Sequence, residues 1–138
     1  MTDTQSKNRI VCTDCKTIAR PGGHYAHLCE AGGLVFISGQ LPITPEGIRL
    51  TDKPFAEQTR QVLFNIDGCL SQAGIDRSRL LQVRIYVTDM ENWPLFNELY
   101  AKWIGGHRPA RAVAGIKELH YGLALEIEAV ALASSALQ

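Results

Sequence analysis

The sequence contains no apolar run that approaches the ~18–20 residues of a membrane-spanning helix, so we expect no association with a membrane. It also lacks an excess of charge, because 14 Lys and Arg residues balance 14 Asp and Glu residues. A chain without net charge has no field to attract nucleic acid, and we expect none as a partner. Residues 1–8 are polar, unlike a signal peptide, and are expected to form a flexible leader. The expected location is the cytoplasm.

Cysteine is scarce, and its four positions do not suggest the disulfide framework of a small secreted protein. The nearest approach to a metal motif is Cys12 and Cys15 followed by His24 and His27. These residue types suit zinc, but two histidines three positions apart on a strand would point to opposite faces. We therefore expect no metal. The roles of both histidines and of the cysteine pair stay open at this point.

Hydrophobic residues make up 46% of the 138 residues, enough for the core of one domain over residues 1–138. Alternation with period two predicts strands, and a period of 3.6 predicts two amphipathic helices. The expected strands are 9–13, 25–31, 34–40, 80–88, 108–115 and 125–130, with a short edge strand at 48–50, and the expected helices are 55–73 and a segment from Asp89 or Asn92 to Gly105. This order indicates an α+β fold with two helices on one face of a mixed sheet.

Arg111 stands out within its strand, because a guanidinium stays charged and requires an anion when it is buried. That anion is either a carboxylate of the protein or one of a ligand. In the last strand, Glu126 and Glu128 lie opposite an apolar face. A simple hairpin between the last two strands would put Arg111 and Glu126 on opposite faces. A bulge, a longer loop or a site shared between subunits would bring them together.

The two predicted helices can cover only one face of the predicted sheet, although the strands carry apolar residues on both faces. An uncovered apolar face favours packing against copies of the same chain. We therefore expect a closed homo-oligomer, in which clefts between subunits would be natural ligand sites.

Several short motifs occur in a fixed order over about residues 20–132. They are Ile37-Ser-Gly-Gln-Leu-Pro42, Glu57-Gln-Thr-Arg-Gln-Val-Leu63, Val87-Thr-Asp-Met90, Phe96-Asn-Glu-Leu-Tyr100, Arg108-Pro-Ala-Arg111 and Glu126-Ile-Glu-Ala-Val-Ala131. In this order and spacing they resemble the RidA/YjgF family of reactive-intermediate deaminases. The resemblance implies a chorismate-mutase-like fold of the bacillus type and a homotrimer with three clefts between subunits. It also implies cofactor-free hydrolysis of imines and enamines, such as 2-aminoacrylate or a 2-aminomuconate-like compound, to 2-oxo acids and ammonia.

The resemblance also assigns roles to individual residues. Arg111 matches the arginine that clamps the substrate carboxylate, and Glu126 matches the carboxylate near the attacking water. Tyr25, Ser38 and Asn97 match residues that line the cleft. Bidentate binding by arginine, together with one general base, would suffice for water to attack an activated imine carbon.

Three positions depart from the family pattern. His24 stands where proline is common, His27 where many members have glutamine, and Val113 where cysteine is frequent. Hydrolysis by water needs no thiol, but the histidines change the polarity of the cleft and so bear on the substrate.

Other interpretations remain open from the sequence. Arg111 and Glu126 could form a structural ion pair, or the same cleft could bind small carboxylates without catalysis. A third is a ribonuclease or translation inhibitor, a description that some relatives carry; the neutral charge argues against it.

Overall fold

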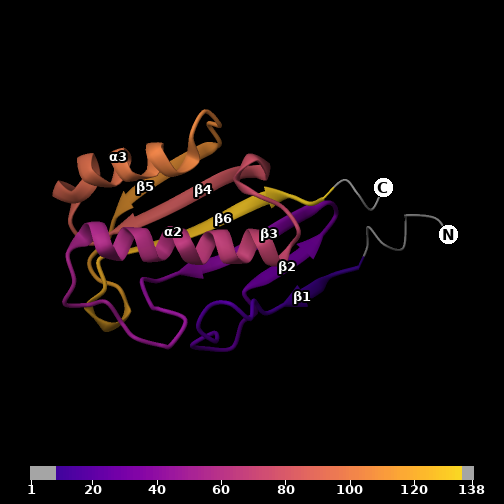
Figure 1. The fold of residues 1–138 in the computed structure, drawn as a ribbon, viewed down its shortest axis with the longest axis horizontal. Helices are drawn as coiled ribbons and strands as arrows, with labels where there is room; N and C mark the ends of the chain where they lie inside the picture. The colour runs from indigo at the N-terminus through magenta and orange to yellow at the C-terminus, as the bar shows by residue number, and fades with distance from the viewer. Residues whose placement is uncertain (1–8, 135–138) are drawn as a thin grey trace.

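The computed structural model describes residues 9–134, so the leader expected at residues 1–8 lies outside the described part. A six-stranded sheet in the order β1-β2-β3-β6-β4-β5 forms one layer, and two helices lie on one of its faces (Figure 1). The elements are β1 Val11–Thr13, β2 Leu28–Ala31, β3 Leu34–Gln40, α2 Phe55–Gln72, η1 Arg77–Arg79, β4 Leu80–Val87, η2 Met90–Asn92, α3 Trp93–Ile104, β5 Ala110–Gly115, η3 His120–Gly122 and β6 Leu125–Leu132. The predicted α+β fold with a mixed sheet is confirmed, since β4 and β5 pair in parallel and the other described pairs are antiparallel.

Several predicted strands differ in extent from the observed ones, and two differ most. The second strand begins at Leu28, because the residues from Tyr25 onward form a loop before entering the sheet. The edge strand predicted at residues 48–50 is reduced to a single bridge between Ile43 and Arg49. In both places the backbone leaves regular pairing beside the same pocket, described below.

The longer helix, α2, begins after Pro54, where a residue without an N–H is tolerated. It ends before Gly74, whose φ of 75° suits the left-handed turn that follows many helices. Its buried apolar residues recur at helical spacing and are Val62, Leu63, Ile66, Cys69 and Leu70. These residues pack on the buried face of the sheet and form one core with it. Among the described residues, neither this helix nor any other has the length and apolar character to cross a membrane.

The last two strands, β5 and β6, follow each other in the chain but do not pair, because β4 lies between them. Val83 of β4 is paired with Arg111 on one side and with Ala129 on the other. Paired residues project to the same face, so Arg111 projects to the face that carries the helices. Glu126 is an odd number of residues from Ala129 and projects to the other face. The sequence left open whether Arg111 and Glu126 share a face; in the structure they project to opposite faces, and β4 rather than a hairpin produces this arrangement.

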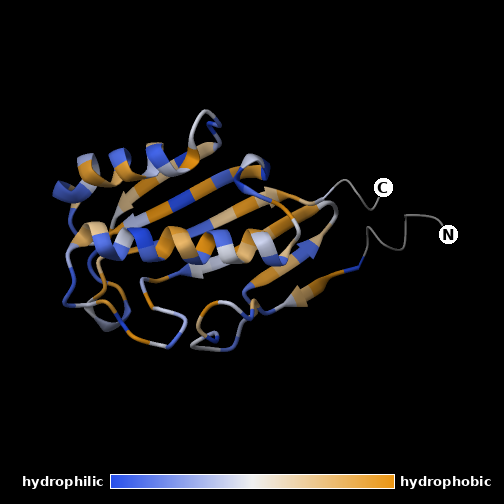
Figure 2. Cartoon of the chain, viewed as in Figure 1, coloured by the Kyte–Doolittle hydropathy of each residue, from blue (hydrophilic) through white to orange (hydrophobic). Residues whose placement is uncertain are grey.

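The face without helices is mixed in character. Phe36 is 46% exposed on it, yet Arg84, Tyr86 and Glu128 lie nearby and are joined by hydrogen bonds. Figure 2 shows hydrophilic residues interrupting the hydrophobic ones along β4 and β6. The prediction that this face is apolar therefore holds for only part of it.

Candidate functional site

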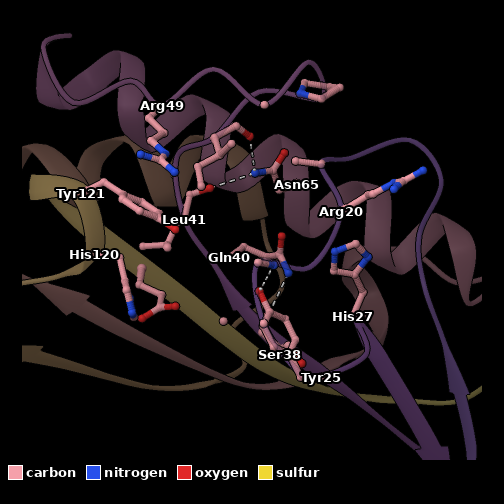
Figure 3. Close-up of a pocket in the computed structure, with 18 of the residues that line it drawn as sticks. Arg20, Tyr25, His27, Ser38, Gln40, Leu41, Arg49, Asn65, His120 and Tyr121 are labelled. Carbon is pink, nitrogen blue, oxygen red and sulfur yellow. Dashed lines mark hydrogen bonds between the residues drawn. The ribbon is translucent and has the colours of Figure 1, made fainter.

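A pocket of about 840 Å³ opens where β3 departs from regular pairing with β6 (Figure 3). Its lining comes mainly from residues 19–27, 38–49, 120–121 and 126–128. Tyr25, Ser38 and Glu126, three of the predicted site residues, line this pocket, whereas Arg111 and Asn97 do not. We call it the Glu126 pocket.

Glu126 projects into the pocket opposite an irregularity in β3. The register shifts between Ile37 and Gln40, so Ser38 and Gly39 together face one residue of β6. A Cβ atom on Gly39 would lie 2.5 Å from Oε2 of Glu126 and 2.9 Å from its Cδ. Glycine therefore leaves the space that the carboxylate occupies, a role that the sequence alone did not reveal.

The neighbouring carboxylates of β6 differ in their partners. Glu128 accepts hydrogen bonds from the Tyr86 hydroxyl at 2.7 Å and from Arg84 Nη1 at 3.3 Å. No side chain of residues 9–134 forms a hydrogen bond or an ion pair with Glu126. Burial raises the pKa of Glu126 above its ordinary value of 4.5, His120 opposes this, and the charge of Glu128 adds to it. A carboxylate with a raised pKa and no fixed partner is suited to accept a proton from a ligand.

The other two predicted residues in the pocket are held by the loop before β2. The Ser38 hydroxyl donates to the carbonyl of Ala26 at 2.6 Å, which fixes this loop beside β3. The hydroxyl oxygen of Tyr25 accepts from the N–H of Gly22 at 3.2 Å, and its own hydrogen stays available to a ligand. Figure 3 shows Tyr25 and Ser38 close together in the pocket.

Two buried amide side chains of α2 position the opposite part of the pocket. Asn65 donates to the carbonyls of Leu41 and Ile43, at 3.0 and 3.2 Å (Figure 3). Gln58 accepts from the N–H of Ala124, just before β6, at 2.9 Å. Both amides lie on the buried side of an amphipathic helix, where unpaired polar groups are costly. Neither amide was among the predicted site residues, although a polar side chain beside the apolar stripe of a helix is a signal of a buried hydrogen bond.

Arg111 belongs to a second group of residues, which we call the Arg111 cluster. Its Nη1 donates to Oδ1 of Asn97 at 3.1 Å. Its guanidinium carbon lies 4.8 Å from the ring centre of Trp93 and 4.9 Å from that of Tyr100. These contacts hold the guanidinium plane against α3 while the side chain stays exposed, with donors free for a carboxylate.

The Glu126 pocket and the Arg111 cluster are therefore two parts of the predicted site on opposite faces of one sheet. Arg111 is on the edge strand β5, and Glu126 is two strands away on β6. Within one described chain the structural ion pair considered from the sequence is not formed, since the polar partner of Arg111 is Asn97. One small ligand can contact both groups only if they come from different copies of the chain.

The cysteine and histidine residues near the N-terminus take separate positions. His27 is buried, and its Nδ1 accepts from the N–H of Cys15 at 2.9 Å, while burial lowers the pKa of its ring. Cys12 instead lies beside Cys29, with 3.6 Å between the sulfur atoms. Over residues 9–134 no three His, Cys, Asp or Glu side chains gather at metal-binding distance. His27 thus has a visible structural role as an acceptor inside the loop that forms the pocket.

Residues 17–133 match the family model described as Endoribonuclease L-PSP. A RutC family protein of Pyrococcus horikoshii is 37% identical over 81% of this chain and 89% of its own length. Reactive Intermediate Deaminase A, chloroplastic, of Arabidopsis thaliana is 32% identical over 91% of this chain and 66% of its own length. Among solved structures, E. coli TdcF with bound serine superposes with a TM-score of 0.83 at 26% identity, covering 90% of this chain and 99% of the other.

The sheet, the helix pair and these matches define a fold of the YjgF type. The chain belongs to the RidA/YjgF (L-PSP) family, which includes reactive-intermediate deaminases.

Proposed function

We propose that this protein hydrolyses imine and enamine derivatives of amino acids to 2-oxo acids and ammonia. The observation that carries the proposal is that the predicted residues form two groups, one with the exposed guanidinium of Arg111 held by Asn97 and one with the Glu126 carboxylate, whose pKa is raised by burial. A reactive imino acid requires both functions, one for its carboxylate and one for the attacking water. The similarity to a named deaminase and to a structure that holds serine, an amino acid with a carboxylate, supports this assignment.

The proposed site lies between two subunits of a homotrimer. Arg111 and Asn97 of one subunit face Tyr25, Ser38 and Glu126 of the next, so that a substrate contacts both groups. A closed cyclic arrangement presents the same two surfaces at every contact and generates equivalent clefts. It would also cover part of the sheet face that carries Phe36.

In the proposed reaction, Arg111 binds the substrate carboxylate through two parallel N–H donors and fixes the imine carbon. Water attacks this carbon of the protonated imine, an iminium ion, while the Glu126 carboxylate accepts one of its protons. The carbon–nitrogen double bond becomes a single bond, and a tetrahedral carbinolamine forms. The proton then moves from Glu126 to nitrogen, the carbon–nitrogen bond breaks, and ammonia leaves with the 2-oxo acid as the second product. The transfer to nitrogen has already returned Glu126 to its ionised form, and the remaining hydroxyl proton is released to solvent as the carbonyl group of the 2-oxo acid forms.

The direct experiment measures ammonia and 2-oxo acid released from an imino acid that an amino-acid oxidase generates in situ. Catalase removes the hydrogen peroxide that the oxidase produces, and a semicarbazide trap quantifies the imine that escapes. We expect the protein to increase hydrolysis and to reduce the semicarbazone. Binding of a 2-oxo acid without any acceleration would contradict the proposal and favour a carboxylate-binding module.

Gly39→Ala tests the shape of the pocket. The added methyl group would overlap the Glu126 carboxylate, whose distance of 2.5 Å from the ideal Cβ leaves no room for both. We expect a roughly 10-fold loss of kcat/KM, less than the ~10² that a full 1 Å misplacement can cause. The carboxylate can rotate away, so we expect the free energy of unfolding to change by less than about 0.5 kcal/mol.

The matched control is Gly106→Ala, because a Cβ there has no neighbour within 4 Å and Gly106 has no positive φ. Steady-state kinetics and thermal unfolding of both variants make the comparison. Equal kinetics for both variants would mean that the position of the Glu126 carboxylate does not limit the reaction.

A further inference from the structure

Arg49 places a positive charge in the Glu126 pocket that the proposed reaction does not use. It lines the pocket, and its backbone is fixed by the bridge to Ile43. Its guanidinium carbon lies only 3.5 Å from the ring centre of Tyr121. None of the ion pairs formed among residues 9–134 includes Arg49, so its charge has no carboxylate partner within this part of the chain.

Tyr121, the platform for Arg49, is held in an uncommon conformation. Its φ of 61° lies in the left-handed region, which a tyrosine seldom adopts without support from its surroundings. Its carbonyl accepts a hydrogen bond from the Thr51 hydroxyl at 2.8 Å. Thr51 is two residues after Arg49, so the same segment fixes both the ring and the guanidinium that stacks on it. The fold therefore fixes the positions of both the Arg49 and the Tyr121 side chains in the pocket.

The Arg49–Tyr121 pair is connected to the proposed catalytic carboxylate through His120. The rings of His120 and Tyr121 have centres 5.8 Å apart, and the proximity of His120 lowers the pKa of Glu126. Figure 3 shows Arg49, Tyr121 and His120 together on one side of the pocket, with Arg20 on the other side. A ligand that reaches Glu126 can thus extend along this side toward Arg49.

Stacking on a ring leaves the edge of a guanidinium, with its N–H donors, free for a planar anion. In the proposed reaction Arg111 of the adjoining subunit already binds the carboxylate next to the imine carbon. We infer that Arg49, supported by Tyr121, binds a second carboxylate at the far end of the substrate, so that the site selects dicarboxylic imino acids. This inference rests on the proposed function for the orientation of the substrate, but it assigns a binding site of its own.

A binding experiment tests the second-carboxylate site without any catalysis. Glutarate and pentanoate have the same number of carbons and differ in one terminal carboxylate. By calorimetry on the intact protein, we expect glutarate to bind roughly 10-fold more tightly, the effect of about one charge-assisted contact. Arg49→Gln should abolish this preference. The control Arg60→Gln, at an exposed position of α2 outside the pocket, should keep it.

A kinetic experiment then separates this inference from the proposed function. The imines of glutamate and norvaline, formed by oxidases, provide the corresponding dicarboxylic and monocarboxylic substrates. We expect Arg49→Gln to lower kcat/KM for the glutamate imine by roughly 10-fold and to leave the norvaline imine within about 2-fold. Circular dichroism and gel filtration confirm that the variant is folded.

The two ideas fail in different ways. Equal binding of glutarate and pentanoate, or a preference that survives Arg49→Gln, would overturn the second-carboxylate site whatever the kinetics. A different outcome is that neither imine is hydrolysed, while glutarate binds more tightly than pentanoate and Arg49→Gln abolishes that difference. In that case the second-carboxylate site is supported and the deaminase proposal is contradicted.

Discussion

Arg111→Lys is expected to reduce kcat/KM for imine hydrolysis on the order of 10²-fold or more while the protein stays folded. Lysine keeps the positive charge but loses the planar donor pair that fixes a carboxylate in one orientation. It also loses the stacking against Trp93 and Tyr100 and the fixed bond to Asn97. The imine carbon would then be held loosely relative to the water, and positioning is what the reaction most requires.

The effect of Arg111→Lys is measured by steady-state release of 2-oxo acid, with circular dichroism and gel filtration as checks of folding and assembly. Arg60→Lys is the matched control, because Arg60 is exposed on α2 and lies outside both groups of site residues. Turnover by Arg111→Lys at the parent rate would mean that this arginine serves packing against α3 and not the substrate.

Glu126→Gln is expected to lower kcat by roughly 10²–10⁴-fold with little change in KM, because glutamine cannot accept a proton from water. In the parent protein, Glu126 is protonated below its raised pKa and cannot then act as a base. The fall of kcat/KM on the acid side should therefore have its midpoint above pH 4.5. The variant should lose this acid-side fall. If Glu126→Gln instead keeps the pH profile of the parent protein, the general base is a group other than Glu126.

The same substitution should stabilise the fold at neutral pH. A carboxyl whose folded-state pKa is raised above its unfolded value disfavours the folded state once it ionises. Its unfavourable contribution is therefore present at pH 7 and disappears below the ordinary value of 4.5. We expect Glu126→Gln to raise Tm by about 1–3 °C at pH 7 and to have no effect near pH 3. A lower Tm at pH 7 would show that the carboxylate has a stabilising partner.

Local patterns in the sequence were sufficient for most of the fold. Period-two alternation located β3 at residues 34–40, and the 3.6-residue period located α2 up to its end at Gly74. The same alternation left open whether Arg111 and Glu126 project to the same face. It did not predict that β4 would lie between β5 and β6, because strand order depends on contacts between distant segments.

The candidate site was less predictable than the fold, since part of the pocket lining comes from loops. Tyr25, placed on a strand by its apolar neighbours, belongs to a loop. Arg49 and Tyr121 meet through the folding of segments far apart in the chain, and no short-range pattern marks that contact. Gly39 needs no special φ, so only the position of the Glu126 carboxylate explains it. Gln58 was not predicted either, although an amide beside an apolar stripe is a signal of a buried hydrogen bond.

A site assembled from Arg111 of one subunit and Glu126 of another is tested most directly by hybrid trimers. Arg111→Lys and Glu126→Gln chains with different affinity tags are co-expressed, and assemblies that carry both tags are purified. Light scattering should give three times the chain mass of 15.2 kDa. Whatever the ratio of the two chains, a mixed cyclic trimer contains one cleft with both residues intact. We therefore predict about one third of the parent activity, from two chains that are each nearly inactive alone. Hybrids no more active than the single variants would contradict a shared site.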